Sequence, residues 1–176
     1  MGSTLVVPHE YDPEAVKAAE ADIRQRLSGK PVDMEVQYAI SNLYRAATVV
    51  SRSAEREVFL PEELSWSAFS VLWVLWVFGE MDSSRLAAEL GITQGTVTGV
   101  RKGLEKQGLV RSGADPTDGR RRTISLTDAG AAKMERIYPG FNSLMCDLLG
   151  DLEPDEINLL AKLLHSVIVR PAKMQP

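Results

Sequence analysis

Residues 83–126 contain, in order, the signals for a helix, a tight turn, a second helix and a hairpin, and this order most constrains the fold. In the stretch LAAELGITQGTVTGV, Ala87 is a small residue where a second helix can cross the first, and Gly91 permits the turn between them. Val97 and Val100 provide apolar contacts that hold the second helix against a core. The segments LVRSG and RRTISLT, on either side of the turn-rich ADPTDG, predict two short strands. The sequence therefore predicts a winged helix-turn-helix.

Helices are predicted on both sides of this lobe, so the chain as a whole is mostly α. Asp12 and Pro13 open the first predicted helix, which runs to about residue 27 and ends at SGKP. A second helix, from about residue 33 to Val58, carries the long, narrow apolar stripe expected of a helix that packs on partner helices. The other predicted helices are an almost wholly apolar one after Ser65, one over residues 128–149 that is interrupted by a kink at Pro139-Gly140, and a last one over residues 154–169.

Charge is distributed unevenly along the chain. The formal net charge is −4, but residues 101–122 hold seven basic and three acidic side chains. That segment therefore carries +4, and the rest of the chain carries −8. A basic segment on an acidic body indicates a local binding site for a polyanion, which the overall charge alone would hide.

Composition and motif content exclude several classes of protein. The longest apolar run, VLWVLWVF, has eight residues, whereas a membrane span needs about 20. With so short a run, we expect no membrane partner. The single cysteine, Cys146, excludes an internal disulfide and fits a reducing compartment, so we expect a cytoplasmic protein. We expect the Cys146 thiol itself to be packed and inert. The sequence contains no nucleophile motif, metal-ligand cluster or phosphate loop. We therefore expect no enzyme activity, no catalytic residues, no metal site and no cofactor.

Three arginines directly follow the predicted hairpin turn. In a strand, Arg120 and Arg122 point to one face and Arg121 to the other. An arginine at a hairpin tip beside a helix-turn-helix is placed to enter a minor groove or to contact phosphate. The alternative is that Asp118 and Arg120 only clamp the turn on each other.

The second helix of the helix-turn-helix contains three glycines four residues apart, Gly95, Gly99 and Gly103. Each glycine inside a helix costs ~1 kcal/mol relative to alanine, so their presence needs a reason. Helical geometry puts Val97 and Leu104 on the face packed on the core and the glycines mainly on the outward face. We hypothesise that the glycines remove side-chain bulk so that the helix can lie close to bases or phosphates. The alternative is that Gly99 and Gly103 are merely tolerated on the surface.

These motifs resemble those of the MarR family of bacterial transcription regulators. The resemblance covers roughly residues 33–170 and depends mainly on LAAELGIT…GTVTGVRKGLEKQGLV, DPTDGRRRTISLTDAG and LEPDEINLLAKLL. It implies a homodimer whose terminal helices interlock, two winged helices that read a palindromic operator in double-stranded DNA, and a small-molecule effector between the dimer helices and the DNA-binding lobe. The chain departs from the family pattern at Ala68, where glutamine is common, at Gly99 and Gly103, where arginine is frequent, and at Glu153. A serine or threonine cap is usual at the last position, so we expect the final helix to start less firmly.

The resemblance also implies three regions within one intertwined domain. Residues 1–31 form an N-terminal extension with an extra helix, which we expect to extend the dimer contact. Residues 32–62 and 127–176 form a helical dimerisation region, and residues 63–126 form the winged helix-turn-helix lobe.

Two sets of candidate site residues follow from these patterns. The expected DNA contacts are Thr93, Gln94, Gly95, Thr96, Thr98, Gly99, Arg101, Lys102, Lys106, Arg120, Arg121 and Arg122. The expected ligand pocket is aromatic, which favours a planar ligand such as an aromatic acid, and its candidate residues are Tyr44, Trp66, Phe69, Trp73 and Trp76. The alternative for the last four is that they belong to the hydrophobic core.

The expected function is therefore that of a homodimeric, sequence-specific DNA-binding regulator, a repressor released by a small aromatic ligand. The alternative is a winged-helix protein-interaction module whose arginines dock an acidic partner. Binding to a defined duplex in the presence of competitor DNA would separate the two.

Overall fold

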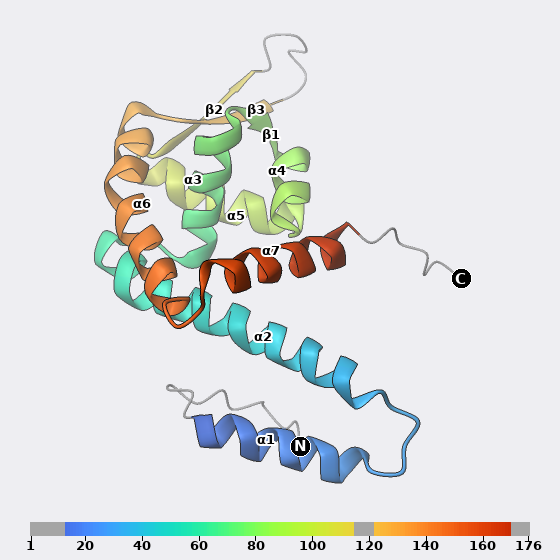
Figure 1. The fold of residues 1–176 in the computed structure, drawn as a ribbon. Helices are drawn as coiled ribbons and strands as arrows, with labels where there is room; N and C mark the ends of the chain where they lie inside the picture. Colours follow the sequence, from blue (N-terminus) through green and yellow to red (C-terminus); the bar gives the residue numbers. More distant parts are fainter. Residues whose placement is uncertain (1–12, 115–121, 170–176) are drawn as a thin grey trace. The chain divides into compact units, whose positions relative to one another are not determined.

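The computed structural model describes residues 13–114 and 122–169 (Figure 1). The chain divides into two compact units, Met1–Val49 and Val50–Pro176, which are described separately. The helices are α1 (Pro13–Leu27), α2 (Met34–Ala54), α3 (Trp66–Phe78), α4 (Ser83–Leu90), α5 (Gln94–Lys106), α6 (Asp128–Leu148) and α7 (Pro154–Ile168). The strands are β1 (Met81–Asp82), β2 (Val110–Ala114) and β3 (Arg122–Leu126). The prediction of a mostly α chain with a winged helix-turn-helix is confirmed.

The first unit contains α1 and most of α2. The extra N-terminal helix predicted from Asp12 and Pro13 is present, and its apolar side is half-buried. Polar contacts add to this packing, because Arg24 Nε donates to the Tyr38 hydroxyl at 3.1 Å and Asn42 Nδ2 donates to Glu20 Oε1 at 3.1 Å. The two helices therefore pair through a mixed apolar and polar seam.

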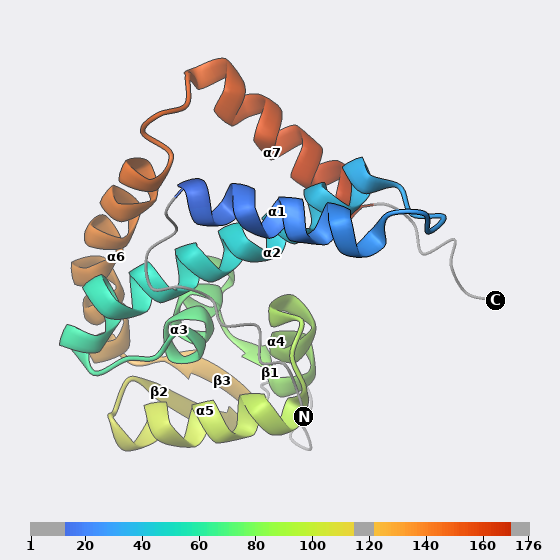
Figure 2. The same ribbon diagram turned by 90° about the horizontal axis from the view of Figure 1, so that it is seen from below.

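In the second unit, the hydrophobic core forms around α3. This helix is apolar nearly all round, and Val71 and Leu72 are completely buried. Ser65 caps it by accepting a hydrogen bond from the Ala68 N–H at 3.2 Å. Phe69 stacks on Phe59 with ring centroids 4.2 Å apart. In Figure 2, α3 lies among α4, α5, α6 and the strands, as expected for a helix with no polar side.

The sheet has three antiparallel strands in the order β1-β3-β2. The predicted hairpin is β2 and β3, in which Ser112 pairs with Ile124 and Ala114 with Arg122. The two-residue strand β1 was not predicted. It pairs Met81 with Ile124, both nearly completely buried, and so closes the sheet against the core.

The interruption predicted at Pro139 and the weak start predicted for the final helix are both wrong. Helix α6 runs through Pro139 without interruption. The proline removes the hydrogen bond to the Glu135 carbonyl, and both residues lie on the exposed side of the helix, where water can satisfy that carbonyl. The final helix also starts firmly, because the Glu156 carboxylate accepts the Glu153 N–H at 2.9 Å and Pro154 takes the first helical position.

The end of α2 is more elaborate than the predicted break at Pro61. After Ala54 the chain forms a wide π-helical turn, Glu55–Phe59, and then a 3-10 turn, Leu60–Glu62. Phe59 is completely buried at this point, and the Glu55 carboxylate accepts the Trp66 N–H at 3.1 Å. The irregular turn therefore sets Phe59 into the core and connects α2 to the start of α3.

No single helix within residues 13–114 and 122–169 is both long and apolar enough to cross a membrane, although one sharply bent pair, residues 34–62 and 66–78, passes on length and composition alone.

The start of α6 is joined closely to the end of α5. Thr127 caps α6 by accepting the Gly130 N–H at 3.0 Å, and its hydroxyl donates to the Gly108 carbonyl at 2.7 Å. The Thr127 N–H donates to the Leu109 carbonyl at 3.1 Å. Gly130 is buried directly against that carbonyl group, so the backbones approach too closely for a side chain.

We expect Gly130→Ala to destabilise the fold by roughly 1–3 kcal/mol, because a Cβ at this position would overlap the Leu109 carbonyl oxygen. Urea denaturation of both proteins measures the difference. Gly140→Ala, in the same helix, is the control, because a Cβ there meets nothing within 4 Å. Equal stability of the two variants would contradict the close approach at Gly130.

Candidate nucleic-acid interface

The helix-turn-helix is held by two capped helices and a left-handed turn. Asp82 caps α4 by accepting the N–H groups of Ser84 and Arg85 at 2.8 and 2.9 Å. Gly91 ends this helix with φ of 64°, a conformation that favours glycine. Thr93 then caps α5 by accepting the Thr96 N–H at 3.1 Å. These local interactions fix where α5 starts and in which direction it leaves the turn.

The inner face of α5 determines what its outer face presents. Val97 and Leu104 are at most 1% exposed, and Val100 is half-buried beside them. The outer positions are exposed, and they are Gln94, Gly95, Thr96, Gly99, Lys102, Gly103 and Lys106. The predicted orientation of the helix is therefore confirmed for its buried face.

Packing within the chain does not require the glycines on this face. A Cβ at Gly99 or Gly103 would meet nothing within 4 Å, and one at Gly95 would make only an ordinary contact with the Thr93 hydroxyl at 3.6 Å. The three glycines are therefore explained either by a partner that approaches this face closely or by the absence of any need for a larger side chain there.

Two of the expected DNA-reading side chains make hydrogen bonds within the lobe. Gln94 Nε2 donates to Ser84 Oγ at 2.9 Å. The Thr98 hydroxyl donates to the backbone carbonyl of Gln94 at 2.9 Å, and Thr98 is half-buried. Lys102 and Lys106 are the exposed cations on α5.

Arg101 does not lie on the outer face with these lysines. Its Nη1 donates to Glu105 Oε1 at 2.6 Å and to Ser112 Oγ at 2.9 Å, and its side chain is 21% exposed. The Ser112 hydroxyl, with the charges of Arg101 and Arg122, lowers the pKa of Glu105 below its ordinary value. Arg101 thus faces β2, and sequence periodicity could not show this because Ser112 lies on another element.

The wing is the hairpin of β2 and β3, and one of the three arginines predicted at its tip lies within the described residues. Arg122 is the first residue of β3 and is exposed opposite Ala114 of β2. In Figure 2, β2 and β3 run alongside α5. Arg120 and Arg121 lie outside the described residues.

The five residues expected to line a ligand pocket have different environments. Phe69 is 3% exposed within the core, whereas Trp66, Trp73 and Trp76 are half-buried against it. Trp76 contacts Tyr138 with ring centroids 5.3 Å apart. Tyr44, in the first unit, is 74% exposed. The core alternative therefore describes Phe69, and the three tryptophans lie at the margin of the core.

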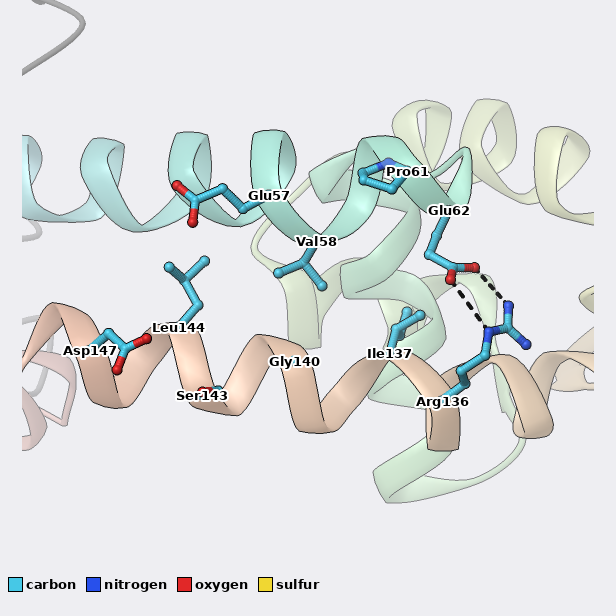
Figure 3. A pocket seen from close by; sticks show the side chains of 10 residues that line it. All are labelled: Glu57, Val58, Pro61, Glu62, Arg136, Ile137, Gly140, Ser143, Leu144 and Asp147. Atoms are coloured by element: carbon cyan, nitrogen blue, oxygen red, sulfur yellow. Dashed lines mark hydrogen bonds and ion pairs between the residues drawn. The ribbon is translucent and has the colours of Figure 1, made fainter.

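A cavity of about 480 Å³ lies between the turns after α2 and the outer side of α6 (Figure 3). None of the five aromatic residues lines it. Its lining residues are Glu57, Val58, Pro61, Glu62, Arg136, Ile137, Gly140, Ser143, Leu144 and Asp147. No sequence signal predicted it, since charged residues along one helix side ordinarily mark a solvated face.

An ion-pair cluster closes one end of this cavity. Arg136 Nη2 lies 2.7 Å from Glu62 Oε2, and Lys133 Nζ donates to the Glu62 carbonyl at 2.6 Å. The Arg136 hydrogen bond is the main reason that the pKa of Glu62 is lowered. Glu57 and Asp147 lie at the other end, on opposite sides of Leu144 (Figure 3). The cluster connects the end of the α2 segment to α6.

The described residues do not assemble a metal centre, and the Cys146 thiol lies outside the hydrophobic core. Within residues 13–114 and 122–169, no group of three or more His, Cys, Asp or Glu side chains could hold a metal ion.

The prediction that Cys146 is packed is wrong for the single chain, where it is exposed near the end of α6. Its apolar neighbours on α6 are only partly covered, so no core surrounds the thiol.

Comparison with known proteins agrees with this geometry. The MarR family matches residues 64–121, which include α3, the helix-turn-helix and β2. The uncharacterised HTH-type transcriptional regulator YwaE of Bacillus subtilis is 35% identical over 157 residues, 88% of this chain and 92% of that protein. The HTH-type transcriptional regulator MgrA of Staphylococcus aureus is 30% identical over 72% of this chain and 85% of that protein.

Solved structures give the same result for the fold. The regulator BpsR of Bordetella bronchiseptica, whose DNA binding is regulated by 6-hydroxynicotinic acid, matches with a TM-score of 0.67 at 26% identity. The match covers 73% of this chain and 91% of that one. A MarR family regulator from Silicibacter pomeroyi matches with a TM-score of 0.68 at 23% identity, over 80% and 93% of the two chains. The winged helix-turn-helix, its exposed α5 and these relatives together establish that the chain belongs to the MarR family of transcriptional regulators.

Proposed function

We propose that this regulator is a homodimeric, sequence-specific repressor that binds a palindromic operator and is released by a small aromatic ligand. The observation that carries the proposal is the outer face of α5, where Gln94, Lys102 and Lys106 are exposed around the glycines. The major groove of B-form DNA admits an α-helix, and a neighbouring hairpin reaches the adjacent minor groove. MarR-family membership favours this reading over the docking of an acidic protein.

Each exposed group has a chemical role in this proposal. Lys102 and Lys106 contact phosphates, which supplies most of the affinity and makes it fall with salt. Gln94 is suited to the edge of adenine, since its amide both donates and accepts. Arg122, with Arg120 and Arg121, engages the minor groove or its phosphates. Thr93, Thr96 and Thr98 hold the start of α5 and contact the backbone.

The outward glycines let α5 approach the groove closely. Because a Cβ at Gly99 meets only open space in the free chain, any cost of adding one arises in the complex. In the free protein the same change favours the helix, since alanine has the higher helix propensity.

Gly99→Ala is therefore expected to raise the free energy of unfolding by up to ~1 kcal/mol and to weaken operator binding. Denaturation and fluorescence anisotropy on one preparation measure the two effects. Gly140→Ala is the control, and we expect it to gain stability in the same way but to leave operator binding unchanged. Unchanged binding by Gly99→Ala would mean that the glycine is only tolerated.

Dimerisation is proposed from the apolar surface of the terminal helices. On α7, Leu159, Leu163 and Val167 are each more than half exposed, and Ile168 is 80% exposed. On α2, Val36 and Ile40 are also exposed. Helices that leave so much apolar surface in water mark an interaction site, and the partner we propose is a second copy of the chain. This assigns residues 32–62 and 127–176 to the dimer, and α1 to its extension.

Selection from random duplexes is expected to return a palindrome whose half-sites are roughly one helical turn apart, because two α5 helices would enter successive major grooves. Leu163→Glu should shift the chain toward a monomer in light scattering and lose affinity for the palindrome but not for a half-site. Lys162→Glu, one residue away, controls for added charge. A Leu163→Glu dimer that binds as wild type would contradict the interface.

The effector is proposed to bind beside Trp66, Trp73 and Trp76 and to change the spacing of the two recognition helices, the α5 helices of the dimer. Phe69 is proposed as the floor of this site, and a ligand contact by Tyr44 stays a prediction. Half-buried indole rings can stack on a planar ligand without loss of the core. The regulation of BpsR by 6-hydroxynicotinic acid supports the choice of aromatic acids. A ligand releases DNA only through its different affinities for the two arrangements.

Titration with aromatic acids, 6-hydroxynicotinic acid among them, is expected to quench tryptophan fluorescence saturably and to release the selected duplex over the same concentrations. Cyclohexanecarboxylic acid, which has the charge without the aromatic ring, is the control. Release of DNA without any quenching would place the effector away from these tryptophans.

A further inference from the structure

The side chains of Arg101, Glu105 and Ser112 close a triangle of hydrogen bonds between α5 and β2. Arg101 Nη1 donates to Glu105 Oε1 at 2.6 Å and to Ser112 Oγ at 2.9 Å. The Ser112 hydroxyl donates to the same Glu105 oxygen at 2.5 Å. The Arg101 and Glu105 side chains are only 21% and 30% exposed, so water screens the pair less than an ordinary surface ion pair.

Glu105 also lies within the electrostatic field of the second strand of the wing. The positive charge of Arg122 on β3 is one of the causes that lower the pKa of Glu105. Ser112 is paired in register with Ile124, which is 1% exposed and so anchors the hairpin in the core. One carboxylate therefore makes hydrogen bonds to the recognition helix, α5, and to β2, and it also feels the charge of Arg122 on β3.

We propose that Glu105, together with Arg101 and Ser112, is a brace that positions the wing relative to the recognition helix for DNA binding. In this role Arg101 is a positioning residue and not a DNA contact. The proposal depends on the DNA-binding role proposed for α5 and the wing. Major-groove and minor-groove contacts have to form together, so a wing already held at the right angle loses less conformational freedom on binding.

The competing role for Arg101 is direct phosphate contact after release from Glu105. The two roles predict opposite effects of removing the Glu105 charge. If Arg101 contacts DNA, Glu105→Gln frees a cation and removes an anion near phosphate, so binding tightens. If the triangle is a brace, the same change loosens the wing and binding weakens, against the electrostatic trend.

The test measures affinity for the duplex selected with wild-type protein, as a function of salt concentration. Ser112→Val and Ser112→Thr form a matched pair, since the two side chains have nearly the same shape and only threonine keeps the hydroxyl. Glu89→Gln is the control for charge removal, because Glu89 pairs with Arg85 within α4 alone at 3.9 Å. Lys102→Ala is the reference for a variant without one phosphate-binding cation.

We expect Glu105→Gln and Ser112→Val each to weaken binding about tenfold, the loss of one well-formed charged hydrogen bond. Their slopes of log affinity against log salt should match wild type, because every phosphate-binding cation is retained, whereas Lys102→Ala should reduce the slope by about 0.9 for each phosphate that is no longer neutralised. Ser112→Thr and Glu89→Gln should bind as wild type. The Glu105→Gln/Ser112→Val double variant should bind no more weakly than either single one, since both break one network.

Binding by Glu105→Gln at or above the wild-type affinity would overturn the brace. So would Arg101→Met if its slope of log affinity against log salt were reduced as much as that of Lys102→Ala. Thermal unfolding of each variant separates a loosened wing from a loosened fold, because the brace predicts weakened binding without a matching loss of melting temperature. If Glu105→Gln does not fold, the Ser112 pair decides. A wild-type protein that selects no duplex would instead refute the proposed function itself.

Discussion

The burial of Val97 and Leu104 is the constraint on which the rest of the DNA-binding lobe depends. These side chains lie seven residues, about two turns, apart on one face of α5 and are almost completely excluded from water. Burying them fixes the rotation of the helix, and Lys102 and the outward glycines are exposed as a consequence. The Thr93 cap and the Gly91 turn fix where the helix begins. Core packing thus selects the surface that, in our proposal, meets DNA.

Local signals made the helix-turn-helix and the hairpin predictable from sequence. Gly91, Thr93 and Ser65 act on neighbouring backbone groups, so their effect depends little on the rest of the fold. Features that depend on distant residues were missed. Strand β1 exists because Met81 meets Ile124, and Arg101 turns from the outer face because Ser112 lies beside it. Neither the cavity beside Glu62 nor the Glu62–Arg136 pair has any periodic signature.

The terminal helices show that a single chain buries only part of its apolar surface. The core of the second unit is closed around α3, and Phe59 and Leu72 are completely buried. By contrast, α7 carries a wide apolar arc of which Leu163 and Ile168 remain exposed. A helix of 15 residues with so much exposed apolar surface gains its stability mainly from packing, so its proper environment includes another surface. Folding of this helix and assembly are therefore coupled in our proposal.

The charge distribution then bears on specificity as well as affinity. Since the Glu105 carboxylate pairs with Arg101, the exposed cations of α5 and β3 that we propose to meet phosphate are Lys102, Lys106 and Arg122. The rest of the chain carries a net −8 outside residues 101–122, and this charge repels DNA in most orientations. Non-specific binding, which is almost wholly electrostatic, is weakened more than binding in which α5 and the wing both fit. In our proposal, an acidic body with a small basic edge therefore favours discrimination among sequences over tight binding to all of them.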